Sequence, residues 1–154
     1  MNEESTQPKR ILYCTDFSPN AAIAFKHAIE VAQRYPNQEL HLLHVIPAPD
    51  AQYWKSYVYM PPIDVDQMAK DAFDKRVADE YESQLPKGLS MIKAFRIGKA
   101  YAEIIRYADE IKADLIVMGR QGRGALESIF FGTVAEKVVK KAKCPVLVIP
   151  LLHS

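Results

Sequence analysis

The chain has 154 residues, of which 49% are hydrophobic and 25% are charged, as is typical of one soluble globular domain. Twenty basic and nineteen acidic side chains leave a formal charge of +1, so the overall charge gives no case for sequence-independent binding of nucleic acid. No apolar run approaches the roughly 20 residues of a membrane helix, and residues 1–8 lack the apolar core of a signal peptide. With only two cysteines as well, we expect a cytoplasmic protein without membrane or nucleic-acid partners.

Apolar strand-like segments alternate with helical patterns in the first half of the chain. A polar tail over residues 1–8 precedes a short apolar strand at 10–15. Ser18 and Pro19 suit the N-cap and first position of a helix that extends to about residue 35, and a strand is expected at 40–46. The segment 47–62 is rich in prolines and aromatic residues. It is expected either to form a lid or partner surface, or to pack its own rings against the sheet.

The second half of the chain continues the alternation. The pattern predicts a helix over 65–85, a strand over 91–97, a helix over 99–111 and a strand over 115–118, followed by a glycine-rich loop, a helix over 133–142 and a strand over 145–149. This order argues for one domain over residues 9–150, a parallel sheet covered by helices on both faces. Ligands of such sheets bind at the carboxyl ends of the strands, where strand order reverses. Asp16 follows the first strand and Gly119 the fourth, so the two would meet in one crevice if those strands are neighbours.

The stretch from Gly119 to Thr133 has the spacing of a phosphate-binding loop. Glycines at 119, 122 and 132 let the backbone approach a ligand closely. Gly132 and Thr133 open a helix, where free N–H groups and the helix dipole favour an anion, and the Thr133 hydroxyl adds a donor. The alternative is a connection that needs glycine only for tight turns. A Walker loop is excluded because Thr133 and Val134, rather than lysine, follow Gly132.

Three further polar residues near this loop each have two interpretations. Asp16 is expected to bind the nucleotide, although an aspartate in this position can instead cap the following helix. Arg120 and Arg123 are expected either to donate charge-assisted hydrogen bonds to phosphates or to be solvated. The loop and Asp16 together predict a phosphorylated nucleotide as ligand.

The cysteines and two histidines have simpler interpretations. Cys14 lies near the predicted site, but a small buried apolar side chain explains it better than redox chemistry. A disulfide with Cys144 is not expected, since the two residues lie at opposite ends of their strands. His41 and His44 are three apart on a strand and therefore point to opposite faces, which makes them a poor metal pair.

The combined pattern resembles the universal stress protein family. The resemblance depends on residues 11–18 with the Thr15-Asp16 pair, and on the spacing Gly119-x2-Gly122-x9-Gly132-Thr133. Residues 42–45, 113–119 and 144–149 support it, and it covers about residues 9–150. It implies a single-domain, three-layer α/β/α fold of the adenine nucleotide alpha hydrolase-like class, with a five-stranded parallel sheet in the order 3-2-1-4-5.

Within that family the glycine pattern is typical of the branch that binds ATP. The resemblance therefore implies ATP as ligand, with Mg²⁺ held by its phosphates rather than by protein ligands. Asp16 is expected to contact the ribose, and Thr15 and Val45 to line the adenine slot. The residues expected at the phosphates and ribose are Met118, Gly119, Gly122, Gly132, Thr133 and Val134, with Arg120 and Arg123 as further donors.

ATP binding alone does not imply ATP hydrolysis, which needs a group that orients water. Glu127 and Glu136 are interpreted as surface carboxylates, so we expect a stress-response regulator in which ATP orders the loop. A slow ATP hydrolase that phosphorylates itself and a dimeric scaffold without nucleotide are the alternatives. The last strand is apolar and expected at the sheet edge. By the resemblance, it is expected to form a homodimer through Pro145 to Ile149.

Overall fold

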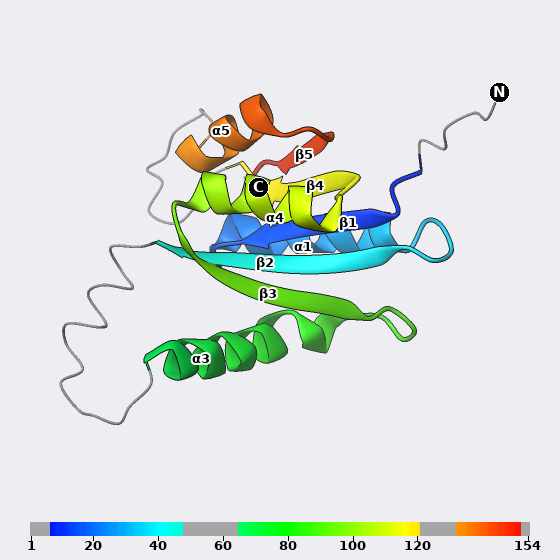
Figure 1. Ribbon diagram of the computed structural model, residues 1–154. Coiled ribbons are helices and arrows are strands. Elements are labelled where there is room, and N and C mark those ends of the chain that lie inside the picture. Colours follow the sequence, from blue (N-terminus) through cyan, green and yellow to red (C-terminus); the bar gives the residue numbers. More distant parts are fainter. Residues whose placement is uncertain (1–6, 48–64, 121–131, 152–154) are drawn as a thin grey trace.

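The computed structural model describes residues 7–47, 65–120 and 132–151 (Figure 1). Its elements are β1 (Arg10–Thr15), α1 (Pro19–Ala32), β2 (Glu39–Pro47), α3 (Val65–Glu80), the short 3₁₀ helix η1 (Glu82–Gln84), β3 (Met91–Gly98), α4 (Ala100–Ile111), β4 (Leu115–Gly119), α5 (Thr133–Lys141) and β5 (Val146–Ile149). Each strand and helix expected from the sequence is present, with its ends within a few residues of the expected positions. Most of the aromatic-rich segment 47–62 lies outside the described residues.

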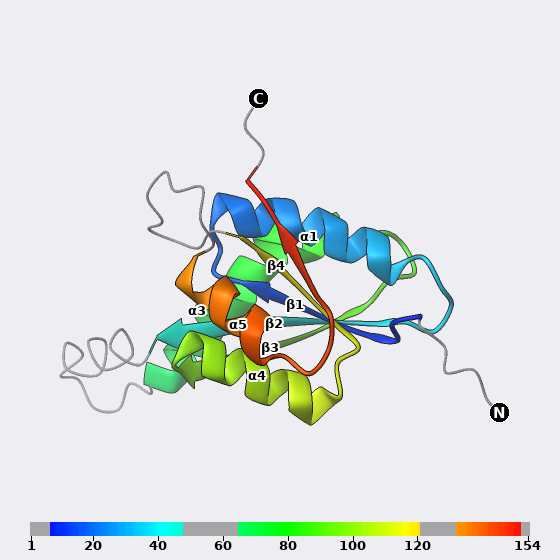
Figure 2. The ribbon, with the colours of Figure 1, turned by 90° about the horizontal axis from the view of Figure 1, so that it is seen from above.

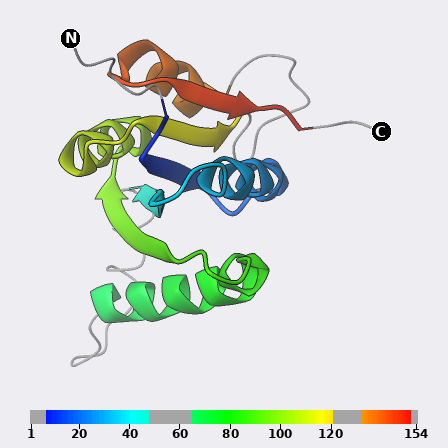
Figure 3. The ribbon, with the colours of Figure 1, turned by 90° about the vertical axis from the view of Figure 1, so that its right-hand side faces the viewer.

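The five strands form one parallel sheet in the order β3-β2-β1-β4-β5, which confirms the expected architecture. β1 lies at the centre and pairs with β2 on one side and β4 on the other. The chain runs outward from β1 through β2 to β3, then crosses back to β4, so strand order reverses between β1 and β4. Figure 3 shows β3 and β5 at opposite ends of the sheet.

Helices cover both faces of the sheet, and alternate strand residues form two cores. Figure 2 shows α1 on one face and α4 and α5 on the other. Ile11 and Tyr13 of β1 point into the first core, where α1 and α3 contribute Phe25, Phe73 and Val77. The second core contains Leu12, Cys14 and Leu43 from the strands and Ile104, Tyr107, Ala135 and Val138 from α4 and α5. Continuous apolar strands are required because both faces are buried.

The helix starts differ in how their backbone N–H groups are satisfied. Ser18 caps α1 as expected, since its hydroxyl accepts the Ala21 N–H at 3.1 Å and Pro19 occupies the first turn. By contrast, no described side chain caps α4 at Lys99 or α5 at Gly132. In the part of the chain that the structure describes, no side chain is therefore bonded to the first N–H groups of α5.

Fewer apolar residues of α3 face the core than the helical spacing of its apolar residues predicts. Phe73, Val77 and the following Tyr81 are buried, but Met68 is 44% exposed. The helix contacts the core through its C-terminal half, so the apolar residues of its first turns do not all face inward. None of the described helices is long and apolar enough to cross a membrane.

Cys14 is buried, and His41 and His44 point to opposite faces of the sheet, as expected. Cys14 and Cys144 are both free, and burial raises the pKa of each thiol above its ordinary value. His41 lies beside Tyr107 of α4, with ring centroids 6.4 Å apart. His44 instead stacks on Phe73 of α3 at 6.2 Å, so the two imidazoles lie on opposite faces of the sheet.

Candidate functional site

The predicted site residues gather at the carboxyl ends of β1, β2 and β4. Thr15 ends β1, Val45 lies near the end of β2, and Met118 and Gly119 end β4. Since β1 and β4 are hydrogen-bonded neighbours, Asp16 and Gly119 follow adjacent strands, as expected. Gly122, Arg123 and Glu127 lie outside the described residues.

The side chains at these strand ends divide between the two faces of the sheet. Val45 and Met118 are buried with Cys14 on the face covered by α4 and α5, where Val134 also packs. Thr15 points to the other face, because its hydroxyl contacts Tyr81 beside α3. The side chains of Thr15 and Val45 therefore lie on opposite faces of the sheet and do not line the same pocket. That Thr15 contacts adenine stays a prediction.

Gly119 is required by packing against the start of α1. A Cβ atom at this position would lie 2.9 Å from Cγ of Asn20 and 3.2 Å from its backbone carbon. Asn20 is buried, and its amide donates to the carbonyl of Ile149 at 2.8 Å. This asparagine joins α1 to the end of β5. Its position directly after Pro19, in a first half of α1 that is otherwise apolar, was the sequence signal that could have revealed it.

Backbone hydrogen bonds connect the end of β4 to both β5 and α5. The Arg120 N–H donates to the Ile149 carbonyl at 2.8 Å, and the Arg120 carbonyl accepts the Gly132 N–H at 2.7 Å. The start of α5 is therefore held next to the end of β4. The Arg120 Nε is buried and has no hydrogen-bond partner among the described residues. It is a donor without a described partner, on a residue whose carbonyl is bonded to the start of α5.

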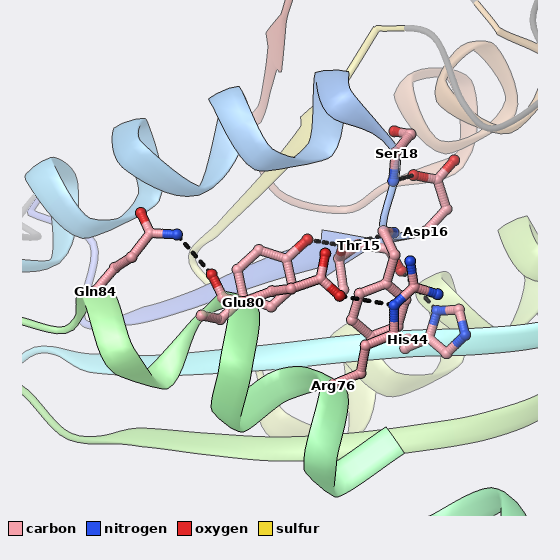
Figure 4. A network of polar contacts seen from close by, with 9 residues as sticks. Thr15, Asp16, Ser18, His44, Arg76, Glu80 and Gln84 are labelled. Carbon is pink, nitrogen blue, oxygen red and sulfur yellow. Dashed lines mark hydrogen bonds and ion pairs between the residues drawn. The ribbon is translucent and has the colours of Figure 1, made fainter. Parts of the chain in front are cut away.

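Asp16 shapes the turn before α1 instead of capping the helix. One of its carboxylate oxygens accepts the Ser18 N–H at 3.0 Å (Figure 4), while the N-cap position belongs to Ser18. The capping alternative for Asp16 is therefore wrong. Half-buried at the end of β1, the carboxylate is fixed by the backbone next to the point where strand order reverses.

A hydrogen-bonded group holds the backbone of residues 15–18 (Figure 4). The Thr15 hydroxyl accepts the Phe17 N–H at 2.9 Å and also shares a hydrogen bond with the Tyr81 hydroxyl. Nδ1 of His44 donates to the Thr15 carbonyl at 2.8 Å. Burial raises the pKa of Tyr81, so its hydroxyl stays protonated and keeps its hydrogen bond to Thr15. The sequence pattern indicated only a core position for Tyr81.

Phe17 adopts a left-handed backbone, with φ of 62°, a conformation that costs a non-glycine residue about 1 kcal/mol or more. Its ring contacts His44 at 4.7 Å and Tyr81 at 5.7 Å between centroids. The Arg76 guanidinium lies 4.4 Å from the same ring centroid and donates to Glu80 at 2.7 Å. These contacts offset the backbone cost and fix the turn that contains Asp16.

Glu136, the described carboxylate of α5, lies on the exposed side of the helix. It accepts a hydrogen bond from Lys140 at 3.0 Å, one turn further along. This i,i+4 pair is a common surface arrangement. The prediction that Glu136 is a surface carboxylate is confirmed.

Sequence comparison identifies relatives over most of the chain. The profile of the universal stress protein family matches residues 8–150. Universal stress protein MJ0531 of Methanocaldococcus jannaschii is 33% identical over 147 residues, covering 92% of this chain and 81% of that protein. Universal stress protein MJ0577 of the same organism is 30% identical over 164 residues, covering 97% and 99%.

Solved structures share the fold. That of MJ0577 superposes with a TM-score of 0.76, covering 96% of this chain and 99% of the other. A universal stress protein of Archaeoglobus fulgidus, determined in complex with dAMP, is 24% identical with a TM-score of 0.59, and covers 91% and 95%. At that identity the likeness shows the fold alone. From the family match and the identity to its relatives, the chain belongs to the universal stress protein family.

Proposed function

We propose that this protein is an ATP-binding regulator of the stress response, with the nucleotide held at the carboxyl ends of β1 and β4. The observation that carries the proposal is the start of α5. This helix has no side-chain cap and is joined to the end of β4 by the hydrogen bond from Gly132 to Arg120. Helix N-termini of this kind bind phosphates, and Asp16 lies at the end of the neighbouring strand.

The described contacts support a particular set of binding groups within this proposal. The Gly132 N–H already donates to Arg120, so the phosphate donors are the following N–H groups of Thr133 and Val134 and the Thr133 hydroxyl. The unpartnered Nε of Arg120 supplies a charged donor. Asp16 is proposed to accept the ribose hydroxyls, because its carboxylate lies in the turn directly after β1, next to the end of β4.

The adenine is proposed to lie beside Val45 and Met118, on the α4 and α5 side of the sheet. An Archaeoglobus protein of the same fold was determined in complex with dAMP, which is consistent with an adenine nucleotide as the ligand. Most donors of the site are N–H groups, so Mg²⁺ is proposed to bind the phosphate oxygens of the nucleotide instead of a protein carboxylate. As a regulator, the protein is proposed to act in the cytoplasm as a homodimer.

Nucleotide recovery and calorimetry test this proposal. Freshly purified protein is denatured, the supernatant is separated by ion exchange against nucleotide standards, and Mg²⁺-ATP is titrated into nucleotide-free protein. Intact ATP and a saturable heat of binding are expected. Recovered ADP, with turnover of added ATP, would instead indicate a hydrolase. No nucleotide and no heat would contradict the proposal.

Two variants at the start of α5 locate the site. Gly132→Val puts a branched side chain where the phosphates are proposed, so ATP binding should be lost. Thr133→Val preserves shape but removes one donor, so binding should weaken by roughly fivefold to tenfold, the value of one hydrogen bond. Urea unfolding serves as the control that both variants fold. If Gly132→Val binds ATP like the wild type, the phosphates lie elsewhere.

A further inference from the structure

Three lysines surround the ring of Tyr101 where α4 and α5 lie side by side (Figures 1 and 2). The Nζ atoms of Lys137, Lys141 and Lys99 lie 4.7, 5.7 and 5.9 Å from the centroid of that ring. Lys99 directly precedes α4, whereas Lys137 and Lys141 are one turn apart on α5. We call these four residues the Tyr101 cluster.

The cluster lysines are exposed like the other lysines of α5, but they differ from them in their ion pairs. Lys140 and Lys143, from the same segment, pair with Glu136 at 3.0 Å and Asp109 at 3.4 Å. In contrast, no carboxylate within the described residues lies within 4.0 Å of the three cluster lysines, and all three are exposed. Three positive charges therefore meet at one aromatic ring without a described counter-ion, in a chain whose net charge is only +1.

The backbone adds to this positive potential. Both α4 and α5 begin at the carboxyl edge of the sheet, and neither start has a side-chain cap among the described residues. Tyr101 belongs to the first turn of α4 and Lys137 to the second turn of α5. The positive ends of two helix dipoles thus lie near the three ammonium groups, and the first-turn carboxylates Glu103 and Glu136 are paired with Arg106 and Lys140.

We propose that the Tyr101 cluster is a binding site for a compact polyphosphate anion. This proposal goes beyond the proposed function, because none of the four residues of the Tyr101 cluster belongs to the proposed nucleotide site. Attraction to the ring holds the ammonium groups together, and a chain of linked phosphates offers several charged oxygens to these donors at once. A single-stranded nucleic acid needs an extended basic groove with several stacking rings, whereas this cluster has one ring and three cations around it.

Calorimetry with sodium tripolyphosphate and the full chain at low salt tests the proposal. The test variant is Lys137→Gln with Lys141→Gln, and the matched control is Lys140→Gln with Lys143→Gln. Each removes two positive charges from the same segment, but only the first alters the cluster. We expect saturable binding by the wild type, a loss of roughly tenfold or more in the test variant, and a change within about twofold in the control. Tyr101→Leu should also weaken binding.

Several outcomes would overturn the proposal: no binding by the wild type, equal binding by the test variant, or equal losses in test and control, which would indicate a general charge effect. Titration of Gly132→Val separates the two sites. If this variant loses ATP but retains tripolyphosphate, the cluster is a second site. If it loses tripolyphosphate while the lysine variant retains it, the anion occupies the nucleotide site and the proposal is wrong. If Gly132→Val still binds ATP weakly, and this binding is lost when Lys137 and Lys141 are also replaced, the cluster binds the triphosphate of the nucleotide. That result would support the proposal.

Discussion

Tyr81 and Thr15 make the buried contact that fixes the turn after β1. The Thr15 hydroxyl receives the Phe17 N–H and bonds the Tyr81 hydroxyl, so one short side chain connects the turn to the end of α3. Asp16, next to Thr15, is held through Ser18. A left-handed residue such as Phe17 persists only where surrounding contacts enforce it. The position and orientation of the Asp16 carboxylate therefore depend in part on Tyr81 and Phe17, which are not among the residues proposed to contact the nucleotide.

Tyr81→Phe tests this dependence by removing one hydroxyl. The expected result is a loss of about 1 to 2 kcal/mol in the free energy of unfolding, because Thr15 loses a buried partner. ATP binding should also weaken severalfold, since the Asp16 turn is less firmly held. Urea unfolding and calorimetry measure the two effects. Tyr107→Phe is the matched control, a buried ring whose hydroxyl has no partner among the described residues, and it should change neither quantity. Equal effects in the two variants would contradict the role of Tyr81.

At the scale of elements, the helices differ in how the backbone groups at their ends are stabilised, and packing in the two cores does not explain these differences. α1 starts with a full side-chain cap, α5 starts with none, and α4 ends at Lys112 in a left-handed conformation with φ of 55°. Glycine is the usual residue at such a helix end because it adopts this backbone without strain. Lys112 is exposed, and its N–H bonds to the carbonyls of Ala108 and Asp109. The end of α4 is thus stabilised by its backbone at a conformational cost.

Lys112→Gly should relieve that cost. A left-handed backbone costs an L-residue about 1 to 2 kcal/mol, and glycine removes this cost. Because glycine also makes the unfolded chain more flexible, part of the gain is lost, and the free energy of unfolding should rise by about 0.5 to 1 kcal/mol. Urea unfolding measures the gain. Lys112→Ala removes the same charge and most of the side chain but retains a Cβ atom, so it should give no gain. A similar increase in both variants would mean that the charge, rather than the backbone, is responsible.

The elements were largely predictable from sequence because buried parallel strands and amphipathic helices have clear periodicities. β1 and the start of α1 were predicted because Ser18 and Pro19 mark the helix start locally. The helix at α3 was also predicted, but the exposure of Met68 in its first turns was not, because an apolar residue can have helical spacing whether or not a sheet lies beneath it. At the candidate site, spacing predicted that Asp16 and Gly119 would lie at the ends of neighbouring strands. Asn20 and Tyr81 were missed, because their roles arise from contacts with Ile149 and Thr15, residues far away in the sequence.

At the scale of the whole molecule, the two edges of the sheet are protected differently. The β3 edge carries Lys93, which pairs with Glu82 at 3.0 Å, and Arg96, which pairs with Glu110 at 2.8 Å. Charges of this kind hinder edge-to-edge pairing of strands. The β5 edge consists of Val146, Leu147 and Val148, all half-buried, with the buried Ile149. An apolar edge without charges is a template for pairing, which supports β5 as the dimer interface.

Val148→Lys should convert the proposed homodimer to a monomer, because it puts a charge on the strand that would pair with its copy. Light scattering after size exclusion measures the mass, and circular dichroism checks that the variant folds. Ile97→Lys, at an exposed position of the β3 edge, adds the same charge to the opposite end of the sheet and should leave the dimer intact. If Val148→Lys is folded and retains the dimer mass, β5 is not the interface. If instead Ile97→Lys gives monomers and Val148→Lys does not, the two copies pair through β3. The charged side chains of the β3 edge would then determine which strand it pairs with.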